Sequence, residues 1–177
     1  VRRASWRRAA EGKAGALFQL PVEGAALLAG RTPAQAAALG APFRALGVLF
    51  QLQDDVLDLY GDKGRGMPGA DLREGKVSAL VVEHLALHPE HTEWLFTLLA
   101  LPRAETPGHE VHWAIERFRE DGALAGVLAR IAAEHAAVLE CPALADEPAL
   151  CAVAGEMACV ALAPIRHVCP GVAEVVG

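Results

Sequence analysis

The sequence predicts an all-α protein. Of its 177 residues, 53% are hydrophobic, and much of this share is alanine and leucine, which favour helices. Runs of β-branched and aromatic residues, which are typical of strands, are scarce. The stretches between prolines and glycines repeat their apolar residues at helical spacing. We therefore expect a single all-α domain over residues 1–177, with no internal domain boundary.

Prolines and glycines divide the chain into the expected helices. Residues 5–30 have helical spacing, with Pro21 permitting a kink or break. Thr32 is a good N-cap for a helix over 33–40, and Pro42 falls near its end or at a kink. Further helices are expected over 43–59, 76–88, 90–100, 111–118, 124–140 and 148–168. Residues 61–75 contain five glycines and one proline, so they are predicted to form a loop.

Charge and composition exclude several kinds of protein. The net charge of −6 argues against a nucleic-acid-binding surface. The four cysteines form no Cys-x-x-Cys pair, so we expect buried free thiols in a reducing cytoplasm. No signal peptide is visible, and no uninterrupted apolar run is long enough to span a bilayer. A cytoplasmic protein without a transmembrane segment is therefore predicted.

One expected helix carries a polar stripe. In the helix over 43–59, five residues share a narrow face: Gly47, Gln51, Asp54, Asp55 and Asp58. The rest of this helix is almost entirely apolar, which is typical of a helix buried among others. We therefore expect the stripe to line an internal cavity. A solvated helix face with a chance acidic cluster is the alternative.

The three aspartates of this stripe need a compensating charge. Carboxylates one turn apart repel each other unless a cation binds between them, and hard divalent ions such as Mg²⁺ prefer oxygen ligands. An EF-hand is excluded because DDVLDLYGDKG lacks the alternate acids and central glycine of that loop. The pattern predicts an Mg²⁺ site at Asp54, Asp55 and Asp58.

The predicted loop that follows offers groups for an anion. Lys63, Arg65, Lys76 and the N–H groups of the glycines can turn inward toward a phosphate. Lys76 and Ser78 also precede a helix, whose N-terminus favours anions. Acids that hold Mg²⁺ beside cations that hold phosphate predict a metal-bridged diphosphate site. For Lys63 and Arg65, an ordinary loop with surface cations is equally open.

At these residues the sequence resembles a known family. The stretch FQLQDDVLDLYGD, followed by GADLREGKVS, is similar to the second aspartate-rich region of the trans-isoprenyl diphosphate synthases, or polyprenyl synthetases. Upstream, EGKAGALFQLPVEGAALLAG resembles the family's helix with a Lys-Thr-(Ala/Gly) motif, and downstream FREDGALAGVLARIAAEHAAVLE resembles a late helix. The resemblance implies an isoprenoid-synthase-type helical bundle around a central cavity.

The resemblance also implies roles for individual residues. The metal ligands are expected to be Asp54, Asp55, Asp58 and Asp71. The substrate-binding residues are expected to be Lys13, Phe50, Gln51 and Lys76. The residues that take part directly in catalysis are expected to be Asp54, Asp55, Lys13 and Lys76.

The implied activity is a Mg²⁺-dependent prenyl transfer. Isopentenyl diphosphate would condense with an allylic prenyl diphosphate, through an allylic cation, to give a longer trans-prenyl diphosphate. A homodimer is the expected assembly. A terpene cyclase is disfavoured because Gly75, Lys76 and Ser78 match the Gly-Lys-x-Thr segment of the synthases.

The sequence departs from the family pattern at several points, two of which affect the predicted site. Ala14 stands where the family usually has threonine, which removes a hydroxyl from the diphosphate pocket. The family's first aspartate-rich motif has no counterpart before Asp54, and the chain starts at Val1 rather than methionine. The pairs Arg2-Arg3 and Arg7-Arg8 follow no aspartate-rich motif, so they are interpreted as surface charge and not as the family's Arg-Arg pair for isopentenyl diphosphate. We therefore expect that the N-terminal helices of the bundle are missing, and that the isolated chain is inactive without an upstream segment or a partner chain. A non-catalytic, regulatory small subunit of a prenyl diphosphate synthase is the alternative.

Overall fold

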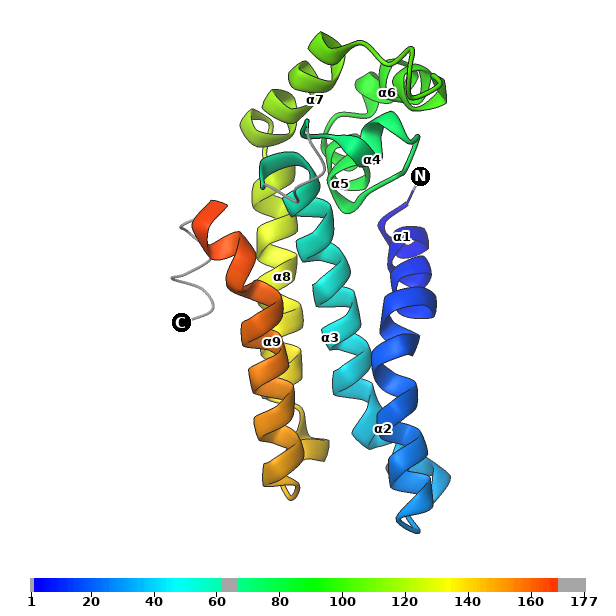
Figure 1. Cartoon of the computed structure of the whole chain (residues 1–177), viewed down its shortest axis with the longest axis vertical. Helices are drawn as coiled ribbons and strands as arrows, with labels where there is room; N and C mark the ends of the chain where they lie inside the picture. The colour runs from blue at the N-terminus through cyan, green and yellow to red at the C-terminus, as the bar shows by residue number, and fades with distance from the viewer. Residues whose placement is uncertain (1, 62–66, 169–177) are drawn as a thin grey trace. The chain divides into compact units, whose positions relative to one another are not determined.

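The computed structural model describes residues 2–61 and 67–168, with residues 167 and 168 described by their backbone alone (Figure 1). Every regular element within these ranges is a helix, which confirms the all-α prediction. The predicted anion-binding roles of Lys63 and Arg65 lie outside the described residues, as does Cys169.

The chain divides into two compact units. The first unit comprises Val1–Trp6 and Asp54–Arg130, and the second comprises Arg7–Gln53 and Ile131–Gly177. Along the chain, the first helix (residues 3–10) and the helices α3 (Pro33–Tyr60) and α8 (Ala123–Leu139) each contribute residues to both units. A single domain over residues 1–177 stays a prediction.

Long helices build the second unit. Helix α1 (Arg3–Ala10), the π-helical turn η1 (Glu11–Gly15) and α2 (Ala16–Leu28) follow one another without a break, as Figure 1 shows. Helix α9 (Pro148–Val168) follows α8 and the short 3₁₀ turn η3 (Pro142–Leu144). The core of the unit contains Leu46, Leu49, Ile131, Leu162 and Ile165, all fully buried.

Helix α3 corrects one sequence prediction. The expected helices over 33–40 and 43–59 are one continuous helix, with Pro42 inside it. A proline within a helix costs about 3 kcal/mol because it removes one backbone hydrogen bond and crowds the preceding turn. Ala36 before Pro42 and Phe43 after it are each only 2% exposed. Burial on both sides of the proline offsets that cost and keeps the helix unbroken.

Shorter helices build the rest of the first unit. These are α4 (Ala70–Arg73), α5 (Ala79–Leu87), the 3₁₀ turn η2 (Pro89–His91), α6 (Thr92–Ala100) and α7 (Gly108–Glu120). Their core contains Leu72, Leu80, Leu95 and Phe118.

Helix α4 lies inside the stretch that was predicted to be entirely loop. Gly69, with φ of +82°, reverses the chain before it, a conformation that suits glycine. The backbone N–H of Gly69 donates to the carbonyl of Asp58, and the N–H of Asp71 donates to the Asp58 carboxylate. The group that stabilises the start of α4 is thus distant in sequence, which is why local composition did not reveal this helix.

The C-terminal part of the chain departs from two expectations. Cys141 and Cys151 are half-buried and Cys159 is exposed, so the prediction of buried thiols is wrong for these three. The stretch Pro148–Arg166 is long and apolar enough to cross a membrane, by length and composition alone, and 22% of its most apolar window is buried. The bent pair Gly108–Glu120 and Ala123–Leu144 would pass the same test only if counted as one span. Such helices are weak evidence of a membrane span, and the absence of a transmembrane segment stays a prediction.

Candidate metal and diphosphate site

Three aspartates converge in the first unit. Asp54 and Asp55 come from α3 and Asp71 comes from α4, and each offers a carboxylate oxygen within 4.8 Å of the others. Asp55 and Asp71 are buried, with 3% and 8% of their surface exposed, and Asp54 is half-buried. Buried carboxylates at this separation repel each other strongly, and a hard divalent cation relieves that repulsion. We call Asp54, Asp55 and Asp71 the acidic group.

Asp55 is fixed by the beginning of α5. Its Oδ2 accepts a hydrogen bond of 2.6 Å from the backbone N–H of Ala79, the first residue of that helix. The adjacent Ser78 is the N-cap, and its hydroxyl oxygen accepts a weak 3.4 Å hydrogen bond from Val81 N–H. The positive end of the α5 dipole therefore faces a carboxylate of the acidic group. Ser78, predicted to lie near phosphate, is buried and engaged in this cap.

Asp58 is bonded to the acidic group through the backbone. Its Oδ2 accepts a 3.0 Å hydrogen bond from the N–H of Asp71, and the side chain is buried. Within the described part of the chain, its carboxylate is not among the three that converge. Through this hydrogen bond, Asp58 helps to position Asp71. That Asp58 is itself a metal ligand stays a prediction.

Lys76 lies beside the acidic group. Its Nζ donates to Asp71 Oδ1 at 2.7 Å and forms an ion pair with Glu74 Oε2 at 2.8 Å. The hydrogen bond from Lys76 to Asp71, followed by that to Glu74, raises the pKa of Lys76. The ammonium is therefore charged at neutral pH, and its side chain is 54% exposed and accessible to an anion. That Glu74 pairs with Lys76 was not predicted from the sequence. The only signal for it in the sequence is that Glu74 lies two residues before Lys76.

The remaining predicted residues belong to the second unit. Lys13 is exposed on the π-helical turn η1, and such turns are frequent at functional sites. Gln51 is half-buried, and Phe50 is 42% exposed, with its ring centroid 5.9 Å from that of Phe18. The acidic group and Lys76 lie in the first unit. The predicted site residues are therefore divided between the two units.

The turn η1 packs closely against α3. A Cβ atom added at Gly47 would lie 2.5 Å from the carbonyl oxygen of Ala14 and 2.6 Å from the Cα of Gly15. Only glycine at position 47 allows the two backbones to approach to this extent. This contact holds the turn that carries Lys13 directly against α3 at Gly47.

The sequence that carries these residues matches a known protein family. The family model described as "Polyprenyl synthetase" matches residues 2–117, which include the acidic group, Lys76 and Lys13. The chain belongs to the polyprenyl synthetase family. The resemblance that the sequence motifs indicated is thereby confirmed.

Two curated relatives carry the name "Short chain isoprenyl diphosphate synthase". The protein from Methanocaldococcus jannaschii is 41% identical over 75 residues, which make up 41% of this chain and 23% of the relative. The protein from Methanothermobacter thermautotrophicus is 37% identical over 75 residues, with the same coverage of 41% and 23%. The match thus spans about a quarter of each of these relatives.

Solved structures of two prenyl diphosphate synthases share the fold. A decaprenyl diphosphate synthase from Rhodobacter capsulatus is similar with a TM-score of 0.75 and 25% identity, over 95% of this chain and 51% of that one. A geranylgeranyl pyrophosphate synthase is similar with a TM-score of 0.73 and 19% identity, over 89% and 51%. These similarities confirm an isoprenoid-synthase-type helical fold, and this chain spans about half the length of those structures.

Proposed function

We propose that this chain is the part of a prenyltransferase that binds Mg²⁺ and the diphosphate of an allylic substrate. The reaction would join isopentenyl diphosphate to an allylic prenyl diphosphate and give a longer trans-prenyl diphosphate. The observation that carries the proposal is the convergence of Asp54, Asp55 and Asp71 beside the ammonium of Lys76. The names of the relatives, which are isoprenyl diphosphate synthases, support the same reaction.

The residues of the acidic group fit Mg²⁺. Their donors are carboxylate oxygens only, they lie within 4.8 Å of one another, and two of the three side chains are buried. Oxygen ligands of this kind suit a hard cation better than a transition metal. When bound there, Mg²⁺ would neutralise negative charge on the diphosphate leaving group.

The side chains of this protein would supply the other requirements of the reaction. Lys76 and Lys13 would neutralise further charge on the diphosphate as the allylic carbon–oxygen bond breaks. The double bond of isopentenyl diphosphate would attack the allylic cation, and loss of a proton would complete the longer chain. Apolar groups such as the neighbouring rings of Phe18 and Phe50 would exclude water from the cation.

A non-catalytic small subunit is the less favoured function. A subunit that only modulates a partner has no need for an acidic group with a lysine beside it, and the curated relatives are named as synthases. Homodimer formation and a cytoplasmic location stay predictions.

An assay of prenyl transfer, with and without the N-terminal half of a related synthase, tests the proposal. We expect no prenyl transfer by the 177-residue chain alone, because charge on the leaving group must be neutralised from more than one side. Adding the N-terminal half of a related synthase, fused or as a separate chain, should give activity that Asp54→Asn abolishes. Turnover by the isolated chain would contradict the need for a complementing segment. Reconstituted activity unaffected by Asp54→Asn, or no reconstituted activity at all, would contradict the proposed site.

A further inference from the structure

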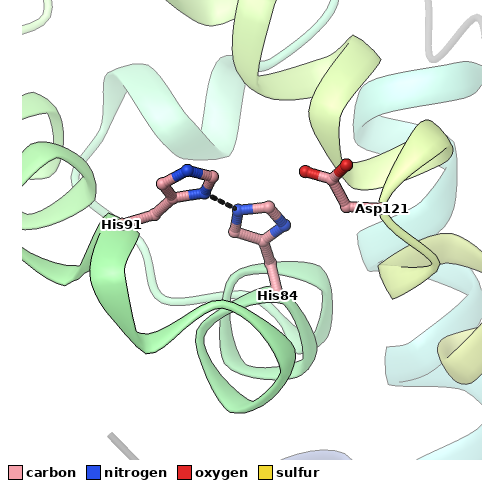
Figure 2. A group of neighbouring side chains, drawn as sticks. All are labelled: His84, His91 and Asp121. Atoms are coloured by element: carbon pink, nitrogen blue, oxygen red, sulfur yellow. Dashed lines mark hydrogen bonds between the residues drawn. The ribbon is translucent and has the colours of Figure 1, made fainter.

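A second cluster of metal-binding side chains lies in the first unit, apart from the acidic group. His84 comes from α5, His91 from η2, and Asp121 caps the end of α7. Each offers one ligand atom, and these atoms lie within 4.8 Å of one another. Figure 2 shows the two imidazole rings and the carboxylate around a common centre, with His84 Nε2 hydrogen-bonded to His91 Nδ1 at 2.8 Å.

Within the described part of the chain, the other ring nitrogen of His84 has no hydrogen-bond partner. His84 is 0% exposed, and its Nδ1 lacks a hydrogen-bond partner among residues 2–61 and 67–168. In Figure 2 this nitrogen lies on the side of the ring that faces Asp121. Buried polar atoms in folded proteins nearly always have a partner, so this nitrogen needs an ordered water or another polar group beside it.

The protonation states suit a metal ion. Burial, with smaller contributions from His91 and His88, lowers the pKa of His84 to about 4. The ring is therefore neutral at pH 7, which is the form that binds metals. The hydrogen bond from Arg117 lowers the pKa of Asp121, so that carboxylate is ionised.

Neighbouring side chains orient the cluster. Arg117 donates from Nε to Asp121 Oδ2 at 2.9 Å and from a second nitrogen to Oδ1. A carboxylate can accept these bonds and still coordinate an ion, because each oxygen has further lone pairs. Trp94 and Trp113 contact each other at 4.4 Å between ring centroids and lie about 6 Å from His91, at 6.1 and 5.9 Å respectively. These contacts restrict how His91 and Asp121 can turn.

We propose that His84, His91 and Asp121 bind one divalent transition-metal ion, of which Zn²⁺ is the best chemical match. Two imidazole nitrogens and one carboxylate oxygen are typical zinc ligands, whereas the oxygen-only acidic group suits Mg²⁺. Ligand atoms on one tetrahedral zinc lie roughly 3.3 Å apart, so small side-chain rotations suffice to gather atoms now within 4.8 Å. The ion would bind His84 Nε2 and His91 Nδ1 in place of the hydrogen bond between them and, with Asp121, would join α5, η2 and α7.

The proposal does not depend on the proposed function, because the acidic group and the histidine cluster share no residue. His88, Glu90 and His91 form a neighbouring group of possible ligands that shares His91 with this cluster. His88 donates from its ring to the backbone carbonyl of Asp121 at 3.4 Å, so it links the two groups.

Titration of the full 177-residue chain with ZnCl₂ tests the proposal. The chain is first treated with a chelator to remove bound metal, and excess Mg²⁺ is then present to occupy the acidic group. Calorimetry should show one equivalent of Zn²⁺ bound. His91→Gln and Asp121→Asn should each weaken binding at least about tenfold. His112→Gln, an exposed histidine on the same helix α7, should leave the affinity unchanged. Substitution of Co²⁺ should give the visible absorption of a tetrahedral nitrogen and oxygen site.

Two results would overturn the proposal. One is the absence of one-to-one Zn²⁺ binding by the folded chain. The other is binding that survives both His91→Gln and Asp121→Asn, or that is removed instead by Asp54→Asn, since the ion would then lie elsewhere. Circular dichroism of each variant identifies any that do not fold, and either variant alone suffices for the comparison.

Discussion

At the residue scale, substitutions of Asp58 test whether this residue positions Asp71 through a hydrogen bond. Asp58→Ala removes the acceptor of the buried Asp71 N–H and should lower the free energy of unfolding by about 1–3 kcal/mol. Asp58→Asn keeps an oxygen acceptor and should cost less. Urea unfolding without Mg²⁺ measures both effects. Equal stability of Asp58→Ala and the unchanged protein would contradict the structural role of this hydrogen bond.

Lys76 and Lys13 can be tested as anion-binding residues. Replacing either with alanine should weaken the binding of Mg²⁺ with inorganic diphosphate by roughly 1–3 kcal/mol, the range for charge-assisted hydrogen bonds. Arg8→Ala, which removes an exposed cation of the second unit, is the control and should have little effect. Equal and negligible effects at all three positions would mean that the two lysines are merely surface charges.

The raised pKa of Lys76 sets the pH dependence of this binding. Because Asp71 and Glu74 raise the pKa of Lys76 above its ordinary value of 10.5, the ion pair is fully formed below that pH. Its contribution to stability is lost only as the pH rises through the higher folded-state pKa. The Lys76-dependent part of diphosphate binding should therefore stay constant from pH 7 to about 10. A loss of that part below pH 9 would contradict the assignment.

At the element scale, the close packing of α3 against η1 makes Gly47 a critical position. Gly47→Ala would place a Cβ 2.5 Å from a backbone carbonyl, so the helix and the turn must separate, at a cost of about 1–3 kcal/mol. Gly24→Ala in α2 is the matched control, since a Cβ there meets nothing within 4 Å. The control should stabilise the protein by about 0.5–1 kcal/mol. Similar thermal stability of the two variants would refute the close approach.

The helices that could be predicted are those whose boundaries are set locally. Helix α9 begins at Pro148 and ends at Val168 as expected, because a proline and apolar periodicity define it. Helix α4 and the continuity of α3 through Pro42 were not predictable in this way. The first depends on a bond to Asp58 and the second on burial of Ala36 and Phe43, and both are tertiary effects.

At the scale of the whole molecule, the family and the acidic group were visible in the sequence because their residues form one compact motif from Phe50 to Lys76. The histidine cluster was not visible. His84, His91 and Asp121 come from three separate elements, and two of the three lie where a helix or turn ends. His84 and His91 are seven residues apart with His88 between them, but Asp121 is thirty residues further along, and only the fold brings it to the two histidines.

The central claim is that the acidic group binds Mg²⁺ together with a diphosphate. Thermal unfolding of the 177-residue chain, with and without MgCl₂ and inorganic diphosphate, tests it most directly. Ligand at a hundred times its dissociation constant should stabilise the protein by about 2.7 kcal/mol and raise Tm by several degrees. Asp54→Asn should abolish most of this rise, whereas Asp146→Asn, which removes an exposed carboxylate of the second unit, should retain it. An undiminished rise in Asp54→Asn would contradict the account.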